Sequence, residues 1–376
     1  MLTGVRPVKL ASGWLREHEG EYASLETAEE DFARWFHKER FVSREKADLA
    51  LSVAWKEREI LDRILPERQE HDTPSFSPAL WPEAEGFVPA PGYSLYIGIP
   101  FCPSICSYCS FSSGSIGQYQ DRVEPYLKAL CRELELTARQ YGYGADPKET
   151  SSFLHPTSIY IGGGTPTSLS AGQLEGLLIR IDQYFHIQEG LAEGTILEYT
   201  VEAGRPDTVT DEKLAVMKNA GADRVSINPQ TMNQETLDLI GLRHTVGQTV
   251  EAFAMARRAG FENINMDIIA GLPGEGREEV KKTLEEIEKL APDSLTIHSL
   301  ALKRSSRLNY EKDIFTDSSF NNSEEIMDMA GQAAARMNMH PYYLYRQKNI
   351  AGNLENVGYA KEGCFGLYNI LIMEEK

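Results

Sequence analysis

The feature that most constrains the fold is a pattern of strand, loop and helix that begins at Tyr93 and repeats six times. Each predicted strand is a short apolar run, and each is followed by a segment with apolar residues at helical spacing. Strands that alternate with helices in this way form parallel βα units with right-handed crossovers. The predicted strands cover residues 93–99, 158–161, 196–201, 224–227, 263–269 and 294–300.

Such units can build either a doubly wound sheet or a barrel, and the strand ends favour the barrel. In α/β barrels the functional residues gather where the strands run into the following loops. We therefore predict an α/β fold whose core is a partial (β/α)6 barrel of the TIM type. The six strands carry at or near this end, in order, three cysteines, a Gly-Gly-Gly-Thr-Pro turn, Glu202, Gln230, Asp267 and His298.

The predicted barrel spans residues 92–303, and the flanking regions differ from it in pattern. Residues 1–65 have helical periodicity, whereas residues 66–91 hold six of the 18 prolines and are interpreted as a linker. Residues 304–376 are predicted to be an α+β extension, with a helix that begins at Ser323 and a last strand at 366–373. That strand ends without a turn, which suggests that the sequence stops inside a domain.

Charge and hydropathy argue against several functional classes. The 38 Lys and Arg and the 56 Asp and Glu give a formal net charge of -18, which argues against a nucleic-acid binder held by phosphate contacts. No apolar stretch approaches the ~18 residues that a membrane-spanning helix needs. The first residues also lack the apolar core of a signal peptide. We therefore expect a globular protein of the cytoplasm.

Three of the five cysteines, Cys102, Cys106 and Cys109, lie close together with the spacing C-x3-C-x2-C. Iron–sulfur clusters are normally held by four cysteines, so three thiolates on one loop imply a cluster with one iron open to a substrate or cofactor. Structural zinc is one alternative, but it requires four ligands in paired spacing. A redox pair at Cys106 and Cys109 is another, and it leaves Cys102 unexplained. Cys131 and Cys364 are interpreted as packing residues.

This spacing, with an aromatic residue before the third cysteine, resembles the signature of radical S-adenosylmethionine (SAM) enzymes. The resemblance implies that the thiolates hold a 4Fe-4S cluster and that the amine and carboxylate of SAM bind the open iron. It further implies cleavage of SAM to a 5′-deoxyadenosyl radical, which abstracts hydrogen from a substrate. The fold would be the partial barrel of these enzymes. The residues that the resemblance assigns to SAM are Tyr96, Tyr108, Gly163, Gly164, Thr165, Glu202, Gln230 and Asp267.

Several of these residues also suit a ligand on physical grounds. Glycines let the backbone approach a bound molecule closely, and Thr165 offers a hydroxyl group. Asp267 lies between Met266 and Ile268, which makes a solvated surface charge the weaker interpretation. Each feature also has an ordinary alternative, because glycine-rich turns serve to reverse the chain and Glu202 can be a solvated carboxylate at a strand end.

Longer runs resemble the oxygen-independent coproporphyrinogen III oxidase family, namely SLYIGIPFC, GGGTPTSL and INMDIIAGLPGE. LTGVRP and PYYLYRQKNIAGNLENVGYA resemble its HemZ-type branch. The implied reaction is the oxidative decarboxylation of two propionates of coproporphyrinogen III to vinyls, which gives protoporphyrinogen IX in haem biosynthesis. The implied partners are this porphyrinogen and a low-potential electron donor.

The sequence departs from the best-known branch of that family at three places. Phe111 stands where that branch has a fourth cysteine, and Gly98 stands where it has a histidine. Leu242 follows Gly241 where an arginine is expected, so no role is assigned to Arg243. The alternative function is that of a haem- or tetrapyrrole-handling protein similar to the family's haem chaperones, although their HNxxYW signature is absent. A zinc-stabilised binding module is a weaker third hypothesis.

A porphyrinogen with four carboxylates would need local positive charge in a protein of net charge -18. Lys303, Arg304, Arg346 and Lys348 are candidates, because they lie just after the sixth strand or within the aromatic stretch. Each can equally be an ordinary surface cation. Residues 304–376 are then expected to cover the substrate.

Overall fold

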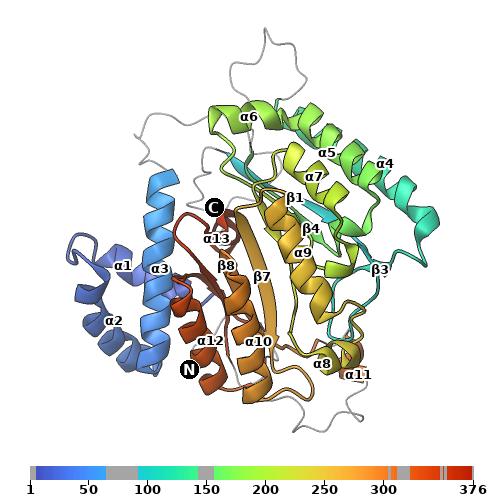
Figure 1. The fold of residues 1–376 in the computed structure, drawn as a ribbon. Helices are drawn as coiled ribbons and strands as arrows, with labels where there is room; N and C mark the ends of the chain where they lie inside the picture. The colour runs from blue at the N-terminus through green and yellow to red at the C-terminus, as the bar shows by residue number, and fades with distance from the viewer. Residues whose placement is uncertain are drawn as a thin grey trace.

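The computed structural model describes residues 6–64, 92–142, 156–303, 306–310, 322–347, 350 and 354–374. Figure 1 shows helices packed over a curved sheet, with three N-terminal helices standing together at one side. The predicted linker 66–91, Arg304 and Lys348 lie outside the described residues.

Eight strands form one sheet in the order β1-β4-β5-β6-β7-β8-β10-β9. The first six match the predicted strands and pair in parallel, each with the next along the chain. The sheet begins at β1 and ends at β9, so the barrel is open and the predicted partial barrel is confirmed. The parallel strands are β1 (Tyr93–Ile99), β4 (Pro156–Gly163), β5 (Glu198–Glu202), β6 (Arg224–Ser226), β7 (Asn263–Ala270) and β8 (Ser294–Ser299).

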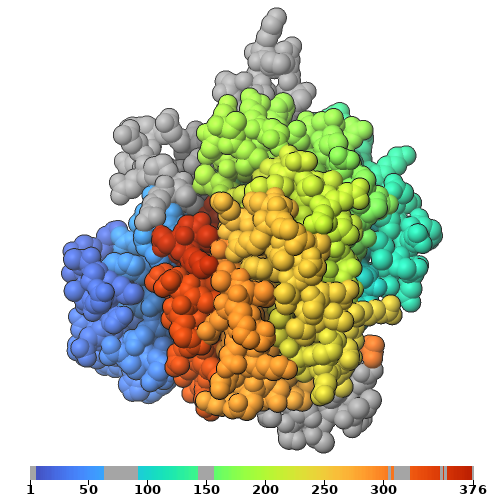
Figure 2. Space-filling view, viewed as in Figure 1, coloured from blue at the N-terminus to red at the C-terminus, as the bar shows by residue number. Residues whose placement is uncertain are grey.

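Helices follow the strands and cover the outer face of the sheet (Figures 1 and 2). Two of them begin at the predicted capping boxes, in which the Ser170 and Thr245 hydroxyls accept hydrogen bonds from the backbone three residues on. The helices of this layer are α4 (Gln120–Gln140), α5 (Ala171–Phe185), α6 (Ile187–Glu193), α7 (Asp211–Asn219), α9 (Val246–Arg258), α10 (Arg277–Leu290) and α12 (Glu324–Arg336). The short helices α8 (Gln234–Leu239) and α11 (Arg307–Tyr310) lie outside this layer, in an apolar cluster with Cys106 and Tyr108 (Figure 1).

Side chains alternate between the two faces of the sheet. The face under the helices is apolar and buried, for example at Ile159, Ile161 and Val225. The inner face is polar, and there the Tyr160 hydroxyl on β4 donates a hydrogen bond to Glu202 on β5 over 2.6 Å. This alternation is the reason that polar residues can sit within strands of a well-packed core.

The C-terminal extension adds two antiparallel strands, β9 (His340–Tyr345) and β10 (Asn356–Ala360), beside β8. The last strand predicted at 366–373 is wrong, because this segment forms a helix, α13 (Leu367–Glu374). A short apolar run has the same pattern in a buried strand and in a buried helix. Here the Glu198 carboxylate on β5 accepts hydrogen bonds from the first two N–H groups of α13, which stabilises the start of a helix.

The N-terminal region is helical, as predicted, and consists of α1 (Val8–Glu17), α2 (Leu25–Arg40) and α3 (Arg44–Ile64). Trp14 and Phe32 pack edge to face in its core. Helix α3 lies against β9 and so covers an edge of the sheet that would otherwise be open to pairing. None of the described helices combines the length and the apolar character of a membrane-spanning segment.

Glu57 on α3 is a buried carboxyl group with an unusual environment. It is 2% exposed, and neither of its carboxylate oxygens has a hydrogen-bond partner. Burial raises its pKa from 4.5 to about 9, and the negative charge of Glu374 adds to this effect. Glu57 therefore takes up a proton when the chain folds above pH 4.5. This proton uptake lowers the free energy of unfolding. The loss is absent below the pKa of the unfolded state and grows as the pH rises toward 9.

We expect Glu57→Gln to raise the free energy of unfolding by up to about 3 kcal/mol near pH 7 and to leave it unchanged near pH 4. Urea unfolding of both chains at the two pH values measures the difference. Glu39→Gln, at an exposed position of α2, is the matched control and should have no such effect. An equal change at both pH values would contradict the buried-carboxyl explanation.

Candidate functional site

The three clustered cysteines lie on the loop that follows β1. Cys102 ends the short strand β2 (Phe101–Cys102), which pairs with β3 (Gly114–Ser115) directly after the loop. In the middle of the loop, the backbone N–H and the hydroxyl of Ser107 both donate to the Ile240 carbonyl over 3.0 Å. The Leu308 N–H donates to the Ser107 carbonyl over 2.9 Å. The cysteine loop is thus tied to the segments that follow β6 and β8.

Each of the three sulfur atoms accepts a hydrogen bond from a different group. The Thr165 hydroxyl lies 3.6 Å from Cys102 Sγ, and the Phe111 N–H lies 3.5 Å from Cys109 Sγ. Arg205 Nη1 lies 3.8 Å from Cys106 Sγ. Burial raises the pKa of the Cys106 thiol to about 11 despite this arginine, so that sulfur becomes a thiolate at neutral pH only when a metal replaces its proton.

Among the residues that the structure describes, no three His, Cys, Asp or Glu side chains converge closely enough to hold one metal ion. A cluster of several irons accepts thiolates at separate metal atoms, so its ligands stand further apart than the ligands of a single ion.

The glycine turn after β4 is pressed against the start of the cysteine loop. The Gly164 N–H donates to the Ile99 carbonyl over 2.7 Å, and the Thr165 N–H donates to the Phe101 carbonyl over 2.8 Å. A Cβ atom at Gly164 would lie 2.8 Å from both of those carbonyl oxygens and 3.0 Å from Cys102 Sγ. Only glycine fits this position.

Glu202 lies at the carboxyl end of β5 and faces the same turn. Its carboxylate accepts hydrogen bonds from the Tyr160 hydroxyl at 2.6 Å and from the Gly163 N–H at 3.2 Å. Gly163 has a φ of +106°, and a Cβ there would lie 3.3 Å from the Tyr96 hydroxyl. Burial raises the pKa of Glu202 to about 7 against these hydrogen bonds, so the carboxyl group can change its charge near neutral pH.

Asp267 on β7 belongs to a chain of polar side chains on the inner face. Asn265 Nδ2 donates to Asp267 Oδ1 over 2.7 Å, and His298 Nε2 on β8 lies 3.7 Å from Oδ2. The Tyr345 hydroxyl on β9 lies 3.2 Å from His298 Nδ1. Burial acts to raise the pKa of Asp267, but the histidine and the other donors outweigh it and hold that pKa below its usual value. An ionised, oriented carboxylate results.

The predicted SAM residues fall into neighbouring groups. Gly164 and Thr165 contact Cys102, and Gly163 lies beside both Tyr96 and Glu202. Gln230 has a left-handed backbone, with a φ of +64°, and its N–H donates to the carbonyl of Asp267 over 3.0 Å. Tyr108 lies on the cysteine loop and packs against the apolar cluster that includes Leu237.

Two of the four candidate cations for substrate are described. Lys303 follows β8, is partly buried, and its carbonyl accepts a hydrogen bond from Ser306. Arg346 is 6% exposed, and its Nε lies 3.8 Å from the Glu355 carboxylate, which also pairs with Lys46. Arg346 therefore already faces an internal counter-charge, and the substrate role of both cations stays a prediction.

Four residues of the site are not among those predicted from the sequence, namely Arg205, Asp207, Tyr160 and Tyr345. Arg205 stands three residues after Glu202, on the same strand-end loop, and this placement was the available signal. An arginine in a loop is usually a surface cation, so its burial at 5% exposure could not be expected from composition.

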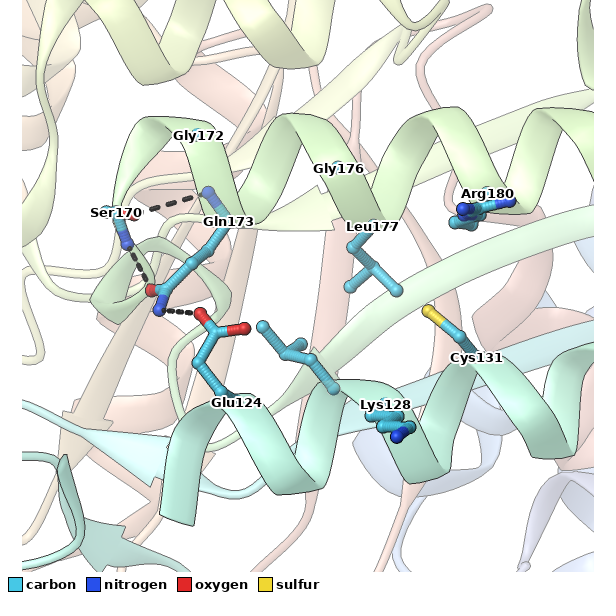
Figure 3. A pocket seen from close by; sticks show the side chains of 10 residues that line it. Glu124, Lys128, Cys131, Ser170, Gly172, Gln173, Gly176, Leu177 and Arg180 are labelled. Atoms are coloured by element: carbon cyan, nitrogen blue, oxygen red, sulfur yellow. Dashed lines mark hydrogen bonds between the residues drawn. The ribbon is translucent and has the colours of Figure 1, made fainter. Parts of the chain in front are cut away.

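A groove of about 570 Å³ lies elsewhere, between α4 and α5 in the outer helical layer (Figure 3). Its lining includes Lys128, Cys131, Gly176 and Arg180. Because α4 and α5 cover the apolar face of the sheet, this groove is separate from the inner-face site around Glu202.

The chain is similar to proteins of one known superfamily. Residues 96–287 match the family model of the radical SAM superfamily. The chain is 46% identical over 285 residues to the oxygen-independent coproporphyrinogen-III oxidase-like protein HemZ of Bacillus subtilis, an alignment that covers 75% of this chain and 54% of HemZ. It is 36% identical over 210 residues to the heme chaperone HemW of the same bacterium, with coverage of 56% and 51%.

A solved structure, coproporphyrinogen III oxidase (HemN) from Escherichia coli, superimposes with a TM-score of 0.55 at 22% identity. The superposition covers 76% of this chain and 59% of that one, and it shows a shared fold. The chain spans about half the length of the curated relatives it matches.

We expect Gly164→Ala to destabilise the chain by about 1–3 kcal/mol, because the added methyl group would collide with two backbone carbonyls. It should also lower the iron bound per chain after anaerobic reconstitution, since the turn contacts Cys102. Gly176→Ala is the matched control: the position lies on α5, is exposed and has no atom within 4 Å of an added Cβ. Thermal unfolding and iron content measure both effects, and equal behaviour of the two variants would refute the explanation.

Proposed function

This chain belongs to the radical SAM superfamily and to its HemZ-type branch, and from that premise we propose that it oxidatively decarboxylates two propionates of coproporphyrinogen III. The product would be protoporphyrinogen IX, in haem biosynthesis. The family's cofactors are a 4Fe-4S cluster and SAM. When bound, they supply a 5′-deoxyadenosyl radical that takes a hydrogen atom from the substrate. The observation that carries the proposal is the 46% identity with HemZ, a coproporphyrinogen-III oxidase-like protein.

The described residues fit a cluster held by three thiolates. Cys102, Cys106 and Cys109 would be its ligands, and each sulfur already has a hydrogen-bond donor beside it. Hydrogen bonds to the sulfurs are among the features by which proteins adjust such clusters. Gly164 lets the turn pack closely against Cys102, because a Cβ atom at that position would lie 3.0 Å from Cys102 Sγ.

For SAM, the proposal assigns distinct tasks to the polar residues of the inner face. Glu202 would accept hydrogen bonds from the amino group, beside the backbone of the glycine turn. Asp267, held ionised by His298, would accept hydrogen bonds from the ribose hydroxyls. Tyr96, Tyr108 and Gln230 would complete the site by the family resemblance.

The substrate site is proposed on the inner face, next to the C-terminal extension. Tyr343 and Tyr345 of β9 stack at 6.1 Å and 8° and contribute an aromatic surface beside His298. Lys303 and Arg346 are proposed to meet substrate carboxylates. The low-potential electron donor and the location in the cytoplasm stay predictions.

The second candidate function is haem or tetrapyrrole handling without decarboxylation. The 36% identity with the heme chaperone HemW favours it. Product analysis separates the two functions, because both would bind the cluster and SAM.

The test is anaerobic reconstitution with iron and sulfide, followed by SAM, a strong reductant and coproporphyrinogen III. We expect 5′-deoxyadenosine together with loss of two carboxyl groups from the tetrapyrrole, and we expect Cys106→Ser to lose both the cluster and SAM cleavage. Deoxyadenosine without a decarboxylated product would count against the oxidase and leave the haem-handling function. Retained iron and SAM cleavage in Cys106→Ser would remove the basis of both.

We expect SAM binding to depend on pH through the ionisation of the Glu202 carboxyl group. Its pKa of about 7 applies to the free site, and a cationic ligand favours the ionised form, so affinity should rise as the carboxyl group loses its proton. Between about pH 6 and about pH 8 we expect a roughly tenfold gain in SAM affinity. Equilibrium binding to wild type and to Glu202→Gln measures it. The ionisation of SAM affects its binding to both proteins, so only the difference between their pH profiles reports on Glu202. An identical pH profile in the two proteins would exclude Glu202 as the source of the pH dependence.

A further inference from the structure

Arg205 is a buried cation that the proposed SAM and substrate contacts do not use. It lies on the loop after β5 and is 5% exposed. Its Nη1 donates to the Ser104 carbonyl over 3.1 Å and lies 3.8 Å from Cys106 Sγ. Its Nη2 donates to the Ser104 hydroxyl over 3.1 Å. One side of the guanidinium group is therefore hydrogen-bonded to the cysteine loop, at Ser104 and Cys106.

The other side of the same guanidinium group faces a carboxylate. Asp207 Oδ1 lies 3.3 Å from Arg205 Nε, and Asp207 Oδ2 lies 3.3 Å from Nη2. His244 also belongs to this environment and is fully buried. Burial, followed by the charge of Arg205, lowers the pKa of His244 to about 4, so this histidine adds no charge at neutral pH. The order in space is Cys106, guanidinium, carboxylate.

We propose that Arg205 raises the reduction potential of the cluster held at Cys106 and that Asp207 limits this effect. Reduction adds one negative charge to the cluster. A fixed positive charge next to one of its sulfurs stabilises the reduced state, and a carboxylate behind that charge partly cancels it. Because Arg205 is buried, salt screens the interaction only weakly. This inference rests on the cluster alone and not on the identity of the substrate.

A purely structural role for Arg205 makes a different prediction. Its bonds to Ser104 hold the loop in place, so any substitution could loosen the cluster site without a defined electrical effect. The sign of the change separates the two roles. Removal of the positive charge and removal of the negative charge should shift the potential in opposite directions.

The experiment is a redox titration of the reconstituted cluster, followed by electron paramagnetic resonance without SAM or substrate. In Arg205→Gln we expect the ratio of reduced to oxidised cluster at the wild-type midpoint to fall about tenfold, a shift of about 59 mV to more negative potential. Asp207→Asn should shift the midpoint to more positive potential. Arg205→Lys, which retains the charge, should stay near wild type.

Arg258→Gln is the matched control, because it removes the same charge from an exposed position on α9. Its midpoint should equal that of wild type. Shifts of Arg205→Gln and Asp207→Asn in the same direction, or midpoints equal to that of Arg258→Gln, would overturn the proposal. If Arg205→Gln fails to hold iron, an unshifted midpoint in Asp207→Asn overturns it instead. Because no tetrapyrrole is present, failure of the decarboxylation proposal would leave this result unaffected.

Discussion

The site depends on one backbone contact, between the glycine turn after β4 and the end of β1. Two hydrogen bonds, from the Gly164 and Thr165 N–H groups to the Ile99 and Phe101 carbonyls, join the turn to the chain just before Cys102. This contact places the Thr165 hydroxyl on a cysteine sulfur and the Gly163 N–H on the Glu202 carboxylate. The cysteine loop and the polar inner face are thereby connected through the glycine turn, and a side chain at Gly164 would disturb both.

Several buried polar residues on the inner face are tolerated because they have hydrogen-bond partners on other elements. Glu198 is the clearest case: burial raises its pKa, although the neighbouring Arg224 opposes the rise, and its carboxylate caps α13. Arg224 in turn donates to Ser294 on β8. These bonds cross several strands, so the inner face holds the curved sheet together as well as lining the site. If these buried groups lost their partners, the desolvation penalty of each group would exceed the stability that its hydrogen bond contributes.

Much of the fold could be predicted from local patterns. The six parallel strands were found because each alternates or runs apolar for its own length, and Ser170 and Thr245 begin helices because their capping boxes are complete within four residues. The spacing of Cys102, Cys106 and Cys109 predicts cluster ligands without any knowledge of the fold, and the ligand role stays a prediction. The final segment was mispredicted because its helical form depends on Glu198, which lies far away in the sequence.

The residues by themselves specified the order of strands and helices and the cysteine loop, since these follow from short-range periodicity and spacing. They also specified Glu202 at the end of a strand, Gln230 after a strand and Asp267 within one. Tertiary structure alone decided that Arg205 is buried against Cys106 and Asp207, that Arg346 faces Glu355, and that the last apolar run is a helix. The physical reason is the same in each case. The charge state, exposure and conformation of these groups depend on partners that the folded sheet brings beside them, and no local pattern encodes those partners.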